Sequence, residues 1–238
     1  MPLIAVGFDL DRTLAVDNKL ERIVGLEMAE SLAVSRGLSF DRDRALAEFD
    51  RAVAASRNAG LPIETALEGV FLELAGPGLE NTVETARFRE IVSERAARYV
   101  QPLPGAQEML ERVESMGVRY AILTNGWSPF QEEKARLIGF RGPVLVSERI
   151  GVRKPAPEAF ALLARQLDVA PSGLWYVGDD PEVDCAGAHA ANATTVWFDW
   201  EGRTYPAGIA PPDHTIRALS EFPELLQGHL GEAAKARA

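Results

Sequence analysis

The first apolar run of the chain, residues 3–8 (LIAVGF), constrains the fold most, because a single strand cannot bury its side chains alone. It is short and continuously apolar, as expected of a strand that is covered on both faces. From about residue 18 to residue 100, apolar side chains recur at three- and four-residue spacing, which predicts about four helices and no strand. The strand at 3–8 must therefore pair with strands that come much later in the chain.

Those partner strands are expected after residue 100. Strand patterns at 118–124, 143–147, 174–178 and 194–198 alternate with helical patterns at 106–117, 128–139, 157–168 and 181–192. Strands separated by helices indicate a parallel sheet with crossover connections. The sequence thus predicts an α/β protein whose three-layer, Rossmann-like core is formed by residues 1–15 and 101–238. A helical domain is expected as an insert at 16–100.

Composition narrows the classes of partner. The formal net charge of −10 argues against a nucleic-acid-binding protein, which needs a basic surface. No segment approaches the roughly 18 consecutive apolar residues of a membrane helix, and the run at 3–8 is too short for a signal peptide. The single cysteine, Cys185, excludes an intrachain disulfide. We expect a cytoplasmic protein without nucleic-acid or membrane partners.

Polar side chains follow the predicted strands at the points where those strands end. Asp9 and Asp11 follow the first strand, Thr124 and Asn125 follow the strand at 118–124, and Lys154 comes after the strand at 143–147. Three further carboxylates, Asp179, Asp180 and Asp184, follow the strand at 174–178. Because ligands bind at the carboxyl ends of the strands in open parallel sheets, we expect these side chains to share one edge of the sheet.

This set of residues suits phosphoryl transfer. A carboxylate can attack phosphorus and form an aspartyl phosphate, which splits hydrolysis into two steps. Mg²⁺ prefers oxygen ligands, and Asp9, Asp179 and the backbone carbonyl of Asp11 are the expected ones. Lys154 and the hydroxyl of Thr124 would bind the phosphoryl oxygens. The side chain of Asp11 would protonate the leaving oxygen and later accept a proton from water.

The same residues carry a resemblance to a known family. The segment FDLDRTL resembles the DxDx[TV] signature of the haloacid dehalogenase-like superfamily, and LTNG, KP and GDDPEVD resemble its second, third and fourth motifs, in the same order. The resemblance implies a phosphatase with a helical C1 cap in the insert. It assigns the nucleophile to Asp9, the general acid/base to Asp11, phosphate binding to Thr124, Asn125 and Lys154, and metal binding to Asp9, Asp11 and Asp179. Asp184, Asp180 and Thr13 are expected to support these groups.

Several alternatives stay open at this point. Asp180 could instead cap the helix that begins near Pro181. Asp11 argues against a 2-haloacid dehalogenase, because the dehalogenases of this superfamily lack the second aspartate of the first motif. A phosphomutase on the same scaffold and a non-catalytic binding protein are the remaining alternatives. The expected partner is a small phosphorylated metabolite, bound by a monomer or homodimer. Its candidate contacts, beyond the motif residues, are Trp127, Arg12, Arg57 and Asn58.

Overall fold

The computed structural model describes residues 4–59, 67, 69–71 and 81–235, and its backbone contacts divide the chain into two compact units. The core unit combines Met1–Val16 with Val100–Ala238, and the helical unit is Asp17–Tyr99. The described part of the chain contains no helix with the length and apolar character needed to cross a membrane. That the two units act as catalytic core and cap stays a prediction.

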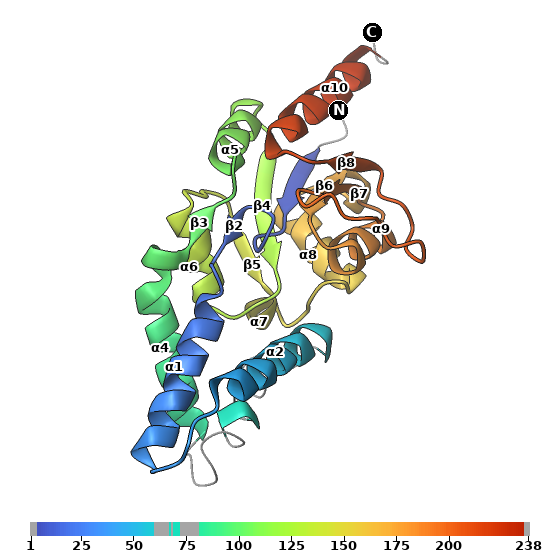
Figure 1. The fold of residues 1–238 in the computed structure, drawn as a ribbon. Coiled ribbons are helices and arrows are strands. Elements are labelled where there is room, and N and C mark those ends of the chain that lie inside the picture. Colours follow the sequence, from blue (N-terminus) through green and yellow to red (C-terminus); the bar gives the residue numbers. More distant parts are fainter. Residues whose placement is uncertain (1–3, 60–66, 68, 72–80, 236–238) are drawn as a thin grey trace. The chain divides into compact units, whose positions relative to one another are not determined.

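A six-stranded, fully parallel sheet forms the centre of the core unit, which confirms the predicted fold class (Figure 1). Its order is β5 (Val144–Val146), β4 (Arg119–Thr124), β1 (Ala5–Phe8), β6 (Leu174–Gly178), β7 (Thr194–Phe198) and β8 (His214–Ile216). The first strand lies at the centre, hydrogen-bonded to β4 on one side and to β6 on the other. This position explains why its four residues are all buried.

Helices cover both faces of this sheet (Figure 1). On one face, α8 (Pro157–Gln166) and α9 (Ala186–Ala190) pack on the strands through a cluster that includes Phe160, Leu163 and Tyr176. Gly7 permits this packing, because a Cβ there would lie 2.4 Å from a methyl carbon of Leu163. On the other face, Phe222 at the start of α10 (Phe222–Lys235) meets Phe8 edge to face, with 5.7 Å between ring centres. Helix α5 (Ala106–Ser115) contacts α10.

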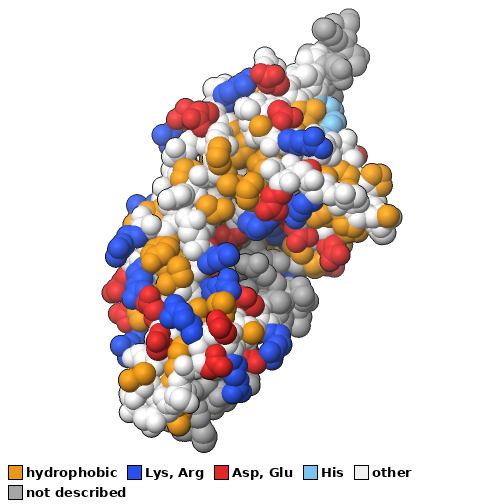
Figure 2. Space-filling model, viewed as in Figure 1, with side chains coloured by type: hydrophobic (Ala, Val, Ile, Leu, Met, Phe, Trp, Pro, Cys, Tyr) orange, Lys and Arg blue, Asp and Glu red, His pale blue; other side chains and the backbone are white. Residues whose placement is uncertain are grey.

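The helical unit contains α1 (Leu20–Ser35), α2 (Arg42–Ala59) and α4 (Asn81–Tyr99). These match three of the four expected helices, whereas the fourth, expected near 63–75, falls mostly outside the described residues. Helix α1 packs against both α2 and α4. Figure 2 shows the Lys and Arg side chains interspersed with Asp and Glu over the face in view, rather than gathered in one basic area.

The structure adds elements that the sequence patterns did not predict. A short antiparallel pair, β2 (Ala15–Val16) and β3 (Gln101–Pro102), lies where the chain leaves and re-enters the core unit. Helix α6 (Phe130–Leu137) lies within the helix expected at 128–139. The single helical turn α7 (Ser147–Ile150), which follows β5, was not predicted. The helix expected at 181–192 begins as a π-helical segment, Pro181–Cys185, before α9 continues it, and 3-10 turns occupy Pro171–Gly173 and Leu219–Glu221.

Candidate active site

Asp9 is the first residue beyond the central strand. Its backbone N–H still donates to the carbonyl oxygen of Val177 at 2.9 Å, so the residue is fixed by the sheet although it follows β1. The side chain is almost completely buried. An isolated carboxylate would be costly here, and its charge therefore requires partners at the same edge of the sheet.

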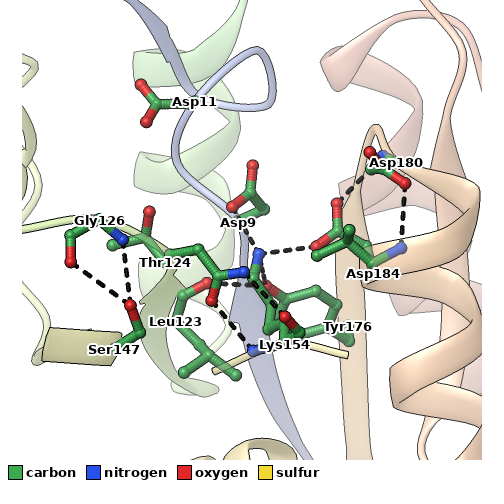
Figure 3. A network of polar contacts seen from close by, with 12 residues as sticks. Asp9, Asp11, Leu123, Thr124, Gly126, Ser147, Lys154, Tyr176, Asp180 and Asp184 are labelled. Carbon is green, nitrogen blue, oxygen red and sulfur yellow. Dashed lines mark hydrogen bonds and ion pairs between the residues drawn. The ribbon is translucent and has the colours of Figure 1, made fainter. Parts of the chain in front are cut away.

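Lys154 provides the positive partner (Figure 3). Its Nζ donates to Oδ1 of Asp9 at 2.6 Å, to Oδ1 of Asp184 at 2.7 Å and to the hydroxyl of Tyr176 at 2.8 Å. Tyr176 in turn donates to the carbonyl oxygen of Leu123 at 2.8 Å. All three donor hydrogens of the ammonium group thus have acceptors, which is the condition for burying a lysine.

The carboxylates outnumber the lysine, and their pKa values reflect it. Burial, reinforced by the charge of Asp184 and opposed by Lys154, raises the pKa of Asp9 to about 7. Burial and the charge of Asp9 raise the pKa of Asp179 to about 6. Burial also raises the pKa of Asp184. Burial works against the charge of Lys154, but Asp184 and Asp9 outweigh it, and the pKa of Lys154 lies well above its usual value.

Asp9, Asp179 and Asp184 form the cluster that fits a metal ion. Each offers an oxygen, and the three oxygens lie within 4.8 Å of one another. Oδ1 of Asp9 binds Lys154 and Oδ2 of Asp179 binds Arg12, which leaves the second oxygen of each without a hydrogen-bond donor among the described residues. Buried carboxylate oxygens of this kind suit a hard divalent cation such as Mg²⁺.

The segment after β6 is shaped to bring Asp184 back toward Lys154. Oδ1 of Asp180 accepts the backbone N–H groups of Glu182 and Val183 at 2.9 and 3.0 Å, so Asp180 caps the π-helical segment. The backbone N–H of Asp180 donates to Oδ2 of Asp184 at 3.0 Å. Gly178 makes room for this return, because a Cβ there would lie 2.3 Å from the same oxygen.

Thr124 is the last residue of β4 and Asn125 follows it, and the two side chains have different partners. Thr124 is buried at the strand end, and its hydroxyl donates to Oε1 of Gln131 at 3.4 Å. Asn125 forms a reciprocal pair with the backbone of Lys154: its Nδ2 donates to the Lys154 carbonyl at 2.9 Å and its Oδ1 accepts the Lys154 N–H at 3.0 Å. The amide of Asn125, predicted to bind phosphate, therefore positions the segment that carries Lys154.

Asp11 lies apart from the three-carboxylate cluster and contacts α6. Nζ of Lys134 donates to its Oδ1 at 2.5 Å and Nε2 of Gln131 donates to its Oδ2 at 3.1 Å. No sequence motif indicated Lys134 and Gln131. The structure shows both on the buried face of α6 with Phe130 and Ala135, where polar side chains are unusual.

Arg12 is held in a left-handed backbone conformation, with φ of 66°, which is uncommon for a long side chain. Its Nε donates to Oδ2 of Asp179 at 3.1 Å and its terminal nitrogen to Glu201 at 2.6 Å, and its guanidinium lies 5.5 Å from the ring centre of Trp200. Arg203, which no sequence motif indicated, donates to the carbonyl oxygen of Asp179 at 2.5 Å and to its Oδ2 at 3.4 Å. Arg12 and Arg203 therefore both bind the carboxylate of Asp179.

The remaining predicted residues are more dispersed. Thr13 is fully buried, and the described residues provide no hydrogen-bond partner for its hydroxyl. Trp127 is buried and stacks on Phe130 with 4.9 Å between ring centres, which places it in the packing of the core unit. Arg57 and Asn58 belong to helix α2, but their side chains lie outside what the structure describes. Their contact with a substrate stays a prediction.

Comparisons with known proteins bear on the family of this chain. The family model of the haloacid dehalogenase-like hydrolases matches residues 5–192. A ribulose-1,5-bisphosphate 5-phosphatase of Halopiger xanaduensis is 32% identical, with 93% of this chain and 98% of the relative covered. A phosphoserine phosphatase of Thermus thermophilus is 29% identical, with 97% of each chain covered. A solved structure of a HAD phosphatase from Thermococcus onnurineus is 25% identical and superposes with a TM-score of 0.73 over 94% of this chain and 98% of its own.

The family model accounts for the chain from the central strand to the end of α9, and the first of these relatives covers nearly all of it. The residues matched by the family model include Asp9, Thr124, Lys154 and Asp179. The chain belongs to the haloacid dehalogenase-like hydrolases.

Proposed function

We propose that the chain is a Mg²⁺-dependent phosphomonoesterase that acts through an aspartyl phosphate on Asp9. The observation that carries the proposal is the environment of Asp9: it is buried, one oxygen is bound by Lys154, and two further carboxylates lie close enough to share a cation. One oxygen of Asp9 thus binds a positive partner, and the other oxygen is available to attack phosphorus. The phosphatases among the relatives support the same reaction class.

Asp9, Asp179 and Asp184, directly or through water, would hold the cation, together with the backbone carbonyl of Asp11. Bound there, Mg²⁺ would offset the charges of the carboxylates and of the phosphoryl group. The same charge balance would lower the raised pKa values of Asp9 and Asp179, and so keep Asp9 in the nucleophilic, ionised form.

In the first step, a carboxylate oxygen of Asp9 forms a bond to phosphorus while the bond from phosphorus to the leaving oxygen breaks. Asp11 gives its proton to that leaving oxygen. In the second step, water attacks the phosphorus of the aspartyl phosphate, Asp11 takes the proton of the water, and phosphate leaves with Asp9 restored. Lys154 and Thr124 bind phosphoryl oxygens, which carry the negative charge in both transition states.

Asp184 and Asn125 act through Lys154 rather than on the substrate. Asp184 shares the ammonium group with Asp9, and Asn125 fixes the backbone that carries it. The helical unit Asp17–Tyr99 is proposed as the cap that excludes water and selects the substrate, as the resemblance implies. The substrate class is a small phosphorylated metabolite, such as a sugar phosphate, nucleotide or short phosphorylated acid.

A phosphate-release screen over sugar phosphates, nucleotides and phosphorylated acids, with and without Mg²⁺, tests the proposal. We expect turnover of members of one class, dependent on Mg²⁺ and abolished in Asp9→Asn, a variant that preserves side-chain size. The matched control is Asp168→Asn, which alters an exposed carboxylate at the far end of α8. Full activity of Asp9→Asn, or activity in chelator equal to that in Mg²⁺, would contradict the proposal.

A further inference from the structure

Both oxygens of the Asp11 carboxylate are bound by side chains of one helix. Lys134 and Gln131, three residues apart on the same face of α6, donate to Oδ1 and Oδ2 at 2.5 and 3.1 Å. Two donors on two oxygens fix the plane of a carboxyl group. The side chain of Asp11 is 32% exposed, so a substrate can reach it.

Lys134 is a buried cation in a place where a helix normally packs an apolar residue. Its side chain is 1% exposed, and its Nζ lies 4.5 Å from the ring centre of Phe130. Burying an ammonium group is expensive unless it is paired, so this position is poorly explained by packing alone. The ion pair with Asp11 compensates the buried charge of Lys134 at the edge of the sheet.

Gln131 connects Asp11 to the strand end that carries Thr124. Its Nε2 donates to Asp11, while its Oε1 accepts the hydroxyl of Thr124 at 3.4 Å. Gly126 leaves the space for this amide, because a Cβ there would lie 2.5 Å from Nε2 of Gln131. The glycine that follows Asn125 therefore has a specific role, which is to admit the side chain that joins Thr124 to Asp11.

The site uses two lysines, one for each aspartate of the first motif. Lys154 binds Asp9, and Lys134 binds Asp11. Figure 3 shows the two carboxylates turned apart, although the residues are only two positions apart in the sequence. Separate partners give the two aspartates separate orientations, which the two different chemical roles require.

We propose that Lys134 and Gln131 are positioning residues that fix the carboxyl group of Asp11 for proton transfer to the leaving oxygen, an inference that rests on the proposed function. The proton passes from Asp11 to the leaving oxygen as the bond between that oxygen and phosphorus breaks. A substrate whose leaving group is strongly basic depends on this transfer, whereas a weakly basic leaving group departs without it. Loss of the positioning residues must therefore affect the two kinds of substrate unequally.

The test compares 4-nitrobenzyl phosphate, which releases a strongly basic alkoxide, with 4-nitrophenyl phosphate, which releases a weakly basic phenolate. In Lys134→Met, we expect kcat/KM for the benzyl ester to fall about 10-fold or more beyond the fall for the phenyl ester, since a positioned general acid is worth roughly 10²–10⁴-fold. This quantity reports the steps up to release of the leaving group and excludes hydrolysis of the common aspartyl phosphate. Gln131→Met, which buries no new charge, should shift the ratio in the same direction by less. Lys134→Arg should restore part of the ratio.

Arg136→Met is the matched control, because Arg136 is exposed on the same helix and pairs with Glu133 instead of Asp11. It should leave the ratio of the two rates unchanged. Asp11→Asn tests the acid role of Asp11 separately: if this variant lowers kcat/KM for both esters equally, that role is wrong. If Asp11→Asn is selective but Lys134→Met and Gln131→Met reduce both rates equally, or reduce neither, the positioning role is overturned.

Discussion

Replacing Lys154 by methionine should destabilise the metal-free protein, and the loss should grow as the pH rises. Lys154→Met removes the ammonium group that lies 2.6 Å from Asp9 and 2.7 Å from Asp184, and leaves two buried carboxylates without it. Breaking a buried ion pair from one side costs about 3–5 kcal/mol, because the charge left behind is uncompensated. Protonation of Asp9 and Asp184 removes the uncompensated charge, so the stability lost by the variant depends on pH.

The sign of this pH dependence follows from the pKa of Asp9. Asp9 in the folded protein has a pKa of about 7, above its usual value of 3.8, although Lys154 already lowers it. Without Lys154 the folded pKa rises further, so from about pH 7 upward the folded variant binds more protons than the folded wild type. The stability lost on substitution therefore grows as the pH rises above about 7, by up to about 1.4 kcal/mol per pH unit for each such group. Near pH 5 the variant should lose only about 1–2 kcal/mol, the scale of a lost hydrogen bond.

Urea unfolding in chelator, followed by tryptophan fluorescence, measures this loss in the core unit, because all four tryptophans belong to it. We expect the difference between wild type and Lys154→Met to be about 2 kcal/mol larger near pH 8 than near pH 5. Mg²⁺ should reduce the difference at the higher pH, since the cation replaces the lost positive charge. A difference that is equal at both pH values, or larger near pH 5, would refute the reasoning.

Three further predictions concern the metal cluster and the segment after β6. Mg²⁺ binding measured by calorimetry should be tighter near pH 8 than near pH 5, because protons compete for Asp9 and Asp179, whose pKa values are about 7 and 6; equal affinity would contradict this. Gly178→Ala should cost about 1–3 kcal/mol and most of the activity by displacing Asp184, whereas Gly208→Ala, with open space around it, should change neither. Asp180→Ala should lower stability by about 0.5–2 kcal/mol through the lost cap and retain Mg²⁺ affinity; a lost affinity at unchanged stability would assign Asp180 to the metal instead.

The parallel core could be predicted from the sequence because continuously apolar strand segments indicate strands that are buried on both faces. The run at 3–8 has no polar alternation, and it occupies the centre of the sheet, where both neighbours are strands from the second half of the chain. β2 and β3 escaped prediction because each has two residues and their pairing joins segments about 85 positions apart, which no local pattern reveals. The π-helical start at 181–185 depends on how Asp184 returns toward Lys154, and that is a tertiary constraint.

For the site, strand ends were informative and helix faces were not. Thr124 ends a strand of the parallel sheet, and Asp9 and Asp179 each follow one, so topology alone brings them together. Gln131 and Lys134 looked like ordinary polar residues of an amphipathic helix, since the sequence alone does not show that the structure buries them. Arg203 comes from a loop after β7, where sequence carries no periodicity. Asn125 was predicted to be a site residue, but its hydrogen bonds to the Lys154 backbone join residues far apart in the sequence and could not be predicted.

The covalent intermediate on Asp9 is the central claim, and trapping it is the most direct test. In Asp11→Asn, 4-nitrophenyl phosphate should still phosphorylate the enzyme, because its leaving group needs no acid, while hydrolysis of the intermediate slows for lack of a base. After acid quench and borohydride reduction, mass spectrometry of the peptide that contains residues 4–12 should find Asp9 alone converted to homoserine. A burst of 4-nitrophenol without modification of Asp9, or with modification at another carboxylate, would contradict the account.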